Sequence, residues 1–174
     1  IRNAAAGPLA ALMPAALLLA HPDLSRPLLR AILATDPDGA RRLDAALILG
    51  MMGDPAAAPL LEATLRQTPW DEGWNYRGMG QFGPCLSRLD ALLHALAATG
   101  AASAPALIAQ KTRELPEDPA FSHCRAAGLA GARLPTPVLA DALADRLRRS
   151  GMQNHVQCDI RALRARATPD TVEN

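Results

Sequence analysis

Apolar residues recur every three or four positions along most of the chain, as they do on one face of an α-helix. No stretch alternates apolar and polar residues in the manner of a strand. Valine, which favours strands, occurs only at positions 138, 156 and 172. The pattern therefore predicts an all-α fold.

A unit of two helices recurs along the chain. In its first clear copy, Gly53-Asp54-Pro55 forms a turn between two apolar stripes. The segment Arg42-Leu43-Asp44-Ala45 returns as Arg88-Leu89-Asp90-Ala91, an offset of 46 residues (88 minus 42). A weaker third copy begins near Phe121. Repeats of two helices at a period of roughly 35 to 46 residues are typical of a HEAT-like α-solenoid, here with about three to four helix pairs.

The repeats predict a single domain over residues 1–174. Its expected parts are an N-terminal helix pair at 1–36, repeats at 37–68, 85–116 and 117–150, a long loop at 69–84, and a C-terminal helix and tail at 151–174. Asp23 or Ser25 is expected to cap a helix that runs to about Thr35, and Gly83-Pro84 marks the expected start of the helix after the loop. We expect the leucines of the stripes to be buried between neighbouring pairs, namely Leu47, Leu61, Leu89, Leu93, Leu107, Leu139 and Leu143.

The amino-acid composition limits the kinds of partner and compartment that suit this chain. With 49% hydrophobic residues the chain can form a core, and 18 basic against 17 acidic residues, spread along it, argue against nucleic acid. The apolar run Leu9–Ala20 is shorter than the roughly 20 residues of a membrane span. The three cysteines, Cys85, Cys124 and Cys158, form no C-x-x-C pair, so buried free thiols are expected.

The stretch Pro69 to Pro84, P-W-D-E-G-W-N-Y-R-G-M-G-Q-F-G-P, concentrates four of the five aromatic residues of the chain with four glycines. Long loops of such composition are usually functional rather than disordered. The aromatic side chains either form a binding platform or fill the gap between two repeats. Our candidate contact residues in this loop are Trp70, Asp71, Trp74, Asn75, Tyr76, Arg77, Gln81 and Phe82.

Gly78-x-Gly80-x-x-Gly83 matches the dinucleotide-binding fingerprint by letter. That fingerprint requires a preceding buried strand, which the pattern does not predict here, so we reject a Rossmann site. A simpler anion site remains open, formed by glycine amides beside Arg77 at the start of the next helix.

Candidate polar residues also lie on the predicted helices. Asp90 and His94 are spaced i, i+4, which suits either a surface pair or an acid-base dyad. His123 and Arg125 lie near the start of a first helix. They either face the same concave side as the loop, or cap the helix or form hydrogen bonds between repeats. A metal site built from these histidines and cysteines would lack a spacing motif, so we expect none.

Loop and repeats together resemble a known family. The loop sequence, followed by Ser87-x-x-Asp90 and later by Phe121-Ser122-His123-x-Arg125-Ala126, resembles the C-terminal helical-repeat region of bacterial FAD-dependent oxidoreductases over roughly residues 40 to 150. In that family a flavin-binding fold precedes the repeats. The resemblance implies that this chain is the C-terminal portion or a separate subunit, and that FAD belongs to a missing domain or partner chain.

Three functional interpretations follow. The favoured one is a non-catalytic module whose loop 69–84 contacts a flavin domain or its substrate, and the alternative is a free-standing scaffold that binds a protein or peptide. An enzyme complete in this chain is least favoured because no nucleophile, base and orienting group can be named. We expect no cofactor bound by this chain alone, no membrane contact, and a bacterial protein with the cytoplasm favoured as its compartment.

Overall fold

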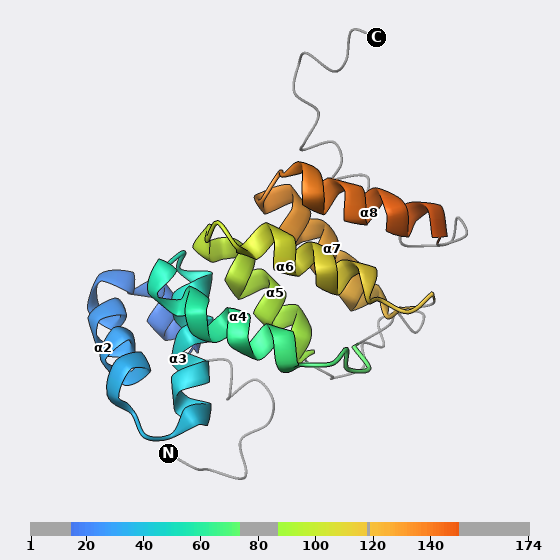
Figure 1. Ribbon diagram of the computed structural model, residues 1–174. Coiled ribbons are helices and arrows are strands. Elements are labelled where there is room, and N and C mark those ends of the chain that lie inside the picture. The colour runs from blue at the N-terminus through green and yellow to red at the C-terminus, as the bar shows by residue number, and fades with distance from the viewer. Residues whose placement is uncertain (1–14, 74–86, 118, 150–174) are drawn as a thin grey trace, which may run out of the picture.

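The computed structural model describes residues 15–73, 87–117 and 119–149, and every regular element within these ranges is a helix (Figure 1). Residues 15–20 are helical. The elements that follow are α2 (Pro22–Thr35), α3 (Gly39–Met51), a short 3₁₀ helix η1 (Pro55–Ala57), α4 (Ala58–Gln67), α5 (Arg88–Thr99), α6 (Ala104–Arg113), α7 (Phe121–Arg133) and α8 (Pro137–Arg149). The predicted all-helical character is thus confirmed for the described part of the chain.

Turn and capping residues explain where these helices begin and end. Asp38 precedes α3 and accepts a hydrogen bond from the amide of Ala40, while Ser87 precedes α5 and accepts one from the amide of Asp90. Gly53 and Gly100 adopt positive φ angles of 75° and 67°, which glycine adopts without strain, and each lies in the turn between two helices. At these positions a helix therefore ends at a glycine turn or begins after a capping side chain.

The helices pack on their near neighbours in a regular order. Helix α2 packs on α3. Helix α3 packs on α5 and α5 on α7, so the first helices of the pairs α3/α4, α5/α6 and α7/α8 lie side by side. The second helices follow the same order, because α4 contacts α6 and α6 packs on α8 (Figure 1). Residues 68–73 extend from the end of α4 toward the start of α7.

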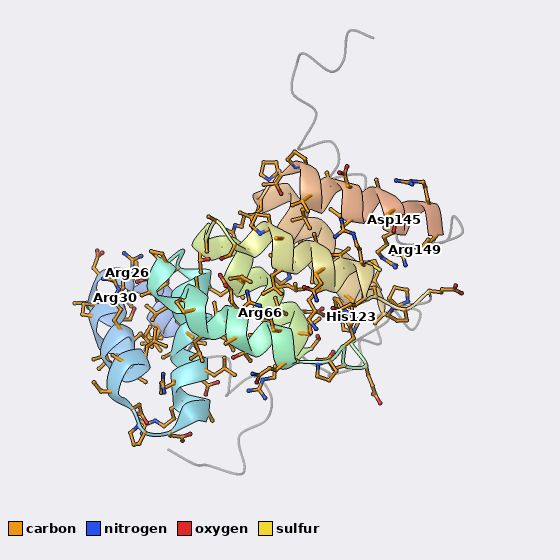
Figure 2. The ribbon with its side chains drawn as sticks, in the orientation of Figure 1. Arg26, Arg30, Arg66, His123, Asp145 and Arg149 are labelled. Atoms are coloured by element: carbon orange, nitrogen blue, oxygen red, sulfur yellow. The ribbon has the colours of Figure 1, made fainter. Side chains whose placement is uncertain are left out.

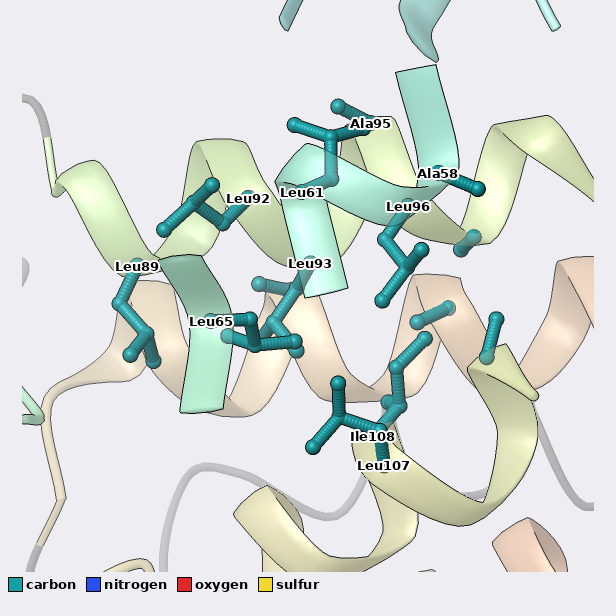
Figure 3. Packing of buried hydrophobic residues seen from close by; sticks show 14 of the residues in the cluster. Ala58, Leu61, Leu65, Leu89, Leu92, Leu93, Ala95, Leu96, Leu107 and Ile108 are labelled. Atoms are coloured by element: carbon teal, nitrogen blue, oxygen red, sulfur yellow. The ribbon is translucent and has the colours of Figure 1, made fainter. Parts of the chain in front are cut away.

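One continuous apolar core joins the pairs. Figure 3 shows its centre, where leucines of α4 and α5 meet residues of α6. The side chains labelled there that are fully buried include Leu61, Leu65, Leu89, Leu92, Leu93, Leu96 and Ile108. Each fully buried leucine contributes roughly 1.5–3 kcal/mol relative to an exposed one, so this cluster supplies a large part of the stability.

The burial of most predicted core leucines is confirmed, with one correction. Leu47 is only half-buried, and Leu49 occupies the buried position instead. The cause is that α3 presents Leu43, Ala46, Leu49 and Gly50 to its neighbours, whereas the sequence pattern predicts a face of Leu43, Ala46, Leu47 and Gly50. Gly50 has no room for a side chain, since a Cβ there would lie 2.9 Å from Cβ of Ala95 on α5.

Two helix starts also differ from prediction. Helix α2 begins at Pro22 with no side-chain cap, whereas the sequence predicts a cap at Asp23 or Ser25. Ser25 lies inside the first turn, where its hydroxyl donates to the carbonyl oxygens of Leu18 and His21. Helix α5 begins at Arg88, a few residues beyond the start that Gly83-Pro84 suggests.

Candidate functional site

The predicted site residues divide into two groups. Trp70, Asp71, Asp90, His123 and Arg125 belong to the described part of the chain. The others lie outside the described residues: Trp74, Asn75, Tyr76, Arg77, Gln81 and Phe82. The Gly78-x-Gly80-x-x-Gly83 motif and the anion site beside Arg77 lie outside them too.

Trp70 fixes the start of the loop to α6. Its indole Nε1 donates a hydrogen bond of 3.1 Å to the carbonyl oxygen of Lys111. The ammonium of Lys111 in turn donates to the carbonyl oxygen of Thr68 at 3.2 Å and pairs with Glu114 at 2.9 Å. Lys111 is only 5% exposed, so its charge is satisfied almost entirely by these two partners.

Asp71 fixes the next residue to the N-terminus of α5. Its Oδ2 accepts from the backbone amides of Arg88 at 2.9 Å and Leu89 at 3.4 Å, and its Oδ1 accepts from the amide of Gly73 at 3.1 Å. Partial burial raises the pKa of Asp71, but the Ser87 side chain and these amides outweigh that effect and lower the pKa below its usual value. The carboxylate is therefore ionised at neutral pH and meets the positive end of the helix dipole.

His123 lies at the centre of this arrangement, at the start of α7 (Figure 2). Its Nδ1 is 2.7 Å from Oδ1 of Asp90 on α5, and its Nε2 is 2.8 Å from the carbonyl oxygen of Asp71. The Trp70 ring packs beside the imidazole, with 4.7 Å between the ring centroids. The histidine side chain is 2% exposed, so the ring is enclosed by the groups that it contacts.

Gly73 closes the other side of the ring. Its φ is +57°, and a Cβ at this position would lie 2.7 Å from ring atoms of His123 and 2.7 Å from Cβ of Ala120. Only glycine meets both requirements without displacing the backbone. We call the set Trp70, Asp71, Gly73, Asp90, Lys111 and His123 the loop anchor.

Both nitrogens of His123 face hydrogen-bond acceptors, so the ring satisfies both only when it carries two N–H groups. Burial lowers the pKa of His123. The hydrogen bonds to Asp90 and to the Asp71 carbonyl, together with the two carboxylate charges, outweigh burial and raise the pKa above its usual value. Because both nitrogens are occupied and the ring is enclosed, His123 has no nitrogen left to act as a general base.

The other two polar candidates occupy different positions. His94 is half-buried on α5, and burial, together with the charges of Arg125 and Arg133, lowers its pKa despite the nearby Asp90. Asp90 is hydrogen-bonded to His123 on the neighbouring helix rather than serving an acid-base dyad with His94. Arg125 is exposed on α7.

Two residues of the loop anchor, Lys111 and Gly73, were not candidates from the sequence. Lys111 is the one lysine in the sequence, and it interrupts an apolar stripe that includes Leu107 and Ile108, a signal of a buried, paired charge. Gly73 gave no comparable signal, because its close approach to His123 depends on tertiary contacts, whereas Ser87, the cap of α5, carries a local one in the Ser87-x-x-Asp90 spacing. A further buried pair, Arg146 of α8 and Cys124 of α7, has a guanidinium nitrogen 3.0 Å from the thiol sulfur.

The described part of the chain contains neither a metal-ligand cluster nor a membrane-spanning helix. Within it, no three His, Cys, Asp or Glu side chains converge as metal ligands would. None of the described helices combines the length and apolar character that a membrane span requires. Comparison of the chain with protein-family models, curated proteins and solved structures found no match.

Proposed function

We propose that the chain is a non-catalytic helical-repeat module or subunit of an FAD-dependent oxidoreductase, in which loop 69–84 contacts the flavin domain or its substrate. The observation that carries this proposal is the loop anchor. The first residues of an aromatic-rich loop are held by side chains and backbone groups of α5, α6 and α7. A contact surface needs such a rigid base, because ordering it on binding would reduce affinity.

The repeat character belongs to the same proposal. We infer that α3/α4, α5/α6 and α7/α8 are HEAT-like repeats stacked in a right-handed superhelix. Support comes from the order of packing, α3 on α5 on α7 and α4 on α6 on α8, and from the repeated Arg-Leu-Asp-Ala segment, which lies within the first two turns of α3 and begins α5.

The chemistry of the loop supports contact with another molecule. Trp70 is fixed at its indole nitrogen, and the loop also contains Trp74, Tyr76 and Arg77. Tryptophan, tyrosine and arginine are the residue types most enriched among the energetically important contacts of protein interfaces. Their concentration beside a fixed base favours a contact surface over a simple filler between repeats.

The test is to isolate the protein from its native host through an affinity tag and measure flavin absorbance and released FAD. The expected result is FAD carried by the same polypeptide or by a second chain. The variants Trp74→Ala and Arg77→Ala are then assayed for association with the flavoprotein and for melting temperature. Each should weaken association by roughly thirtyfold, equivalent to about 2 kcal/mol, with little change in melting temperature.

Arg66→Ala is the matched control, since Arg66 is exposed on α4 outside the loop and should leave association unchanged. If the native preparation carries no FAD, the flavin assignment is wrong. If both loop variants melt at lower temperature but associate normally, the loop only fills space between repeats. Co-isolation of a partner without flavin that releases both variants would support the alternative, a free-standing scaffold.

A further inference from the structure

His123 connects three parts of the fold, and its two ring contacts depend on how many protons the imidazole carries. Nδ1 contacts Asp90 of α5, Nε2 contacts the backbone of Asp71 in the loop, and the residue itself belongs to α7. A neutral imidazole has one N–H group and one lone pair. The two contacts can therefore both be hydrogen bonds only in the imidazolium form.

Loss of a proton affects the two contacts unequally. The carboxylate of Asp90 is a stronger acceptor than a peptide carbonyl, so the remaining proton stays on Nδ1. The lone pair of Nε2 then faces the carbonyl oxygen of Asp71 at 2.8 Å, and the attraction becomes a repulsion. The contact between α7 and α5 survives, whereas the contact between α7 and the loop is lost.

We propose that His123 is a pH-sensitive latch, which as an imidazolium holds the backbone carbonyl of Asp71 against α7 and on deprotonation releases this one contact, while the bonds of Trp70 to α6 and of the Asp71 carboxylate to α5 remain and the helices stay folded. The latch acts within the described residues and does not depend on the identity of any partner. It also explains why Trp70 and Gly73 enclose the ring, since they exclude water that would otherwise replace the lost hydrogen bond.

The charged groups around the ring set the direction of the response. Asp71 of the loop, with Oδ1 3.6 Å from Nε2, and Asp90 of α5 both favour the charged ring. Lys111 of α6 is directed to Thr68 and Glu114, Arg146 of α8 to Cys124, and Arg125 of α7 is exposed. On α5, His94 lies near Asp90 with a pKa that is lowered chiefly by burial, so as pH rises it loses its proton before His123 does.

The direction of the pH response follows from these charged groups. The pKa of His123 in the folded protein is raised above its unfolded value of about 6.5. Below that value the ring is charged in both states and the latch is closed. As the pH rises through the higher folded pKa, the folded protein loses the proton and the latch opens. Opening is therefore expected on the alkaline side of pH 6.5.

The experiment uses the full chain labelled with ¹⁵N-histidine, titrated from acid to alkaline pH by NMR. His123, assigned by comparison with His123→Gln, should show two protonated nitrogens at the acid end and the Nδ1–H tautomer at the alkaline end. The Gly73 amide resonance, and Trp70 fluorescence in a Trp74→Phe background, should change with the same midpoint. Circular dichroism should report constant helix content.

Two variants separate the latch from general effects of pH. Asp90→Asn should lower the midpoint by about 1 pH unit or more, since it removes the carboxylate in contact with the ring. His94→Gln, on the same helix, should leave the midpoint unchanged. His123→Gln should abolish the change at Gly73 and Trp70. The latch is overturned if His123 is neutral at pH 6, if Gly73 and Trp70 do not follow its titration, or if helix content is lost at the same midpoint.

Discussion

The guanidinium of Arg30 on α2 meets the carboxylate of Asp54 in a two-point contact. Nε lies 2.8 Å from Oδ2, and one Nη lies 3.1 Å from Oδ1. Arg26, one turn earlier, approaches the same carboxylate at 3.5 Å. Asp54 also accepts from the amide of Ala56 at the start of η1, so a single buried side chain joins α2 to the turn between α3 and α4.

Replacing Asp54 by alanine should therefore destabilise the fold. The substitution removes a charge-assisted hydrogen-bond pair and a cap, and we expect a loss of about 2–3 kcal/mol in the free energy of unfolding, measured by urea denaturation. Asp54→Asn, which keeps the cap acceptor, should lose less. Asp44→Ala is the control, because Asp44 is exposed on α3 and should change stability by less than about 0.5 kcal/mol. Equal losses for Asp44→Ala and Asp54→Ala would contradict the assignment.

The same carboxylate predicts how stability responds to acid. Burial raises the pKa of Asp54, but the hydrogen bonds from Arg30 and Ala56 and the charges of both arginines lower it below its usual value. Asp71 also has a lowered pKa. Both groups contribute stability that is fully present above their unfolded pKa of about 3.9 and is lost as pH falls through their folded values.

Thermal melts between pH 5 and pH 2 should therefore show a steep fall in melting temperature below about pH 4. Asp54→Asn should flatten that fall, because an amide does not titrate. An unchanged acid profile in this variant would show that the pairing with Arg30 contributes nothing to stability.

Burial of Leu93 provides a test of the core. Leu93 is fully buried on α5 between neighbouring helices (Figure 3), and Leu93→Ala should lower the free energy of unfolding by about 2–5 kcal/mol. Leu24 is 80% exposed on α2, so Leu24→Ala should change it by less than about 0.5 kcal/mol. Chemical denaturation of the two variants side by side checks the pair. A loss for Leu93→Ala as small as that of Leu24→Ala would show that the helix face is wrong.

The crossing of α3 over α5 depends on Gly50. A Cβ at this position would approach Leu61, the Cβ of Ala95 and its carbonyl oxygen at 2.8–2.9 Å, and backbone atoms cannot yield as a flexible side chain does. Gly50→Ala should cost about 1–3 kcal/mol through overpacking. At Gly39, the first residue of the same helix, an added Cβ would meet no neighbouring side chain or backbone within 4 Å, so Gly39→Ala should be neutral or stabilise by up to about 1 kcal/mol.

Calorimetry should show a lower melting temperature for Gly50→Ala and an equal or higher one for Gly39→Ala. A neutral Gly50→Ala would contradict the close packing of α3 on α5, and a destabilised Gly39→Ala would contradict the open space around that residue.

The helices could be predicted from sequence because apolar periodicity and turn residues are local signals. Asp36-Pro37-Asp38-Gly39 and Leu134-Pro135-Thr136-Pro137 have the composition of turns, and they separate α2 from α3 and α7 from α8. The face of α3 was less predictable, since a choice between Leu47 and Leu49 depends on how α3 is rotated against α5. The local sequence pattern allows either residue to be the buried one, and the packing of α3 on α5 determines which of them it is.

The sequence singled out residues that meet in the structure, but it did not predict how they contact one another. Trp70, Asp71, Asp90 and His123 are all candidates from the sequence, and the structure brings the four together around the ring of His123. Their pairing was not predicted, because Asp90 has a closer histidine in the sequence at His94, one turn away. Tertiary packing of α5 on α7 places His123 nearer, and this contact spans 33 residues.

The order of helix packing has a mechanical consequence. Within the described residues, the principal contacts of each helix are with elements close to it in sequence, and α2 has no such contact with α7 or α8. A force applied between the ends of this array would be borne by a few interfaces at a time, so helix pairs should detach in succession. Pulled in this way, the chain would lengthen in discrete steps, and the loop anchor would hold α5, α6 and α7 together.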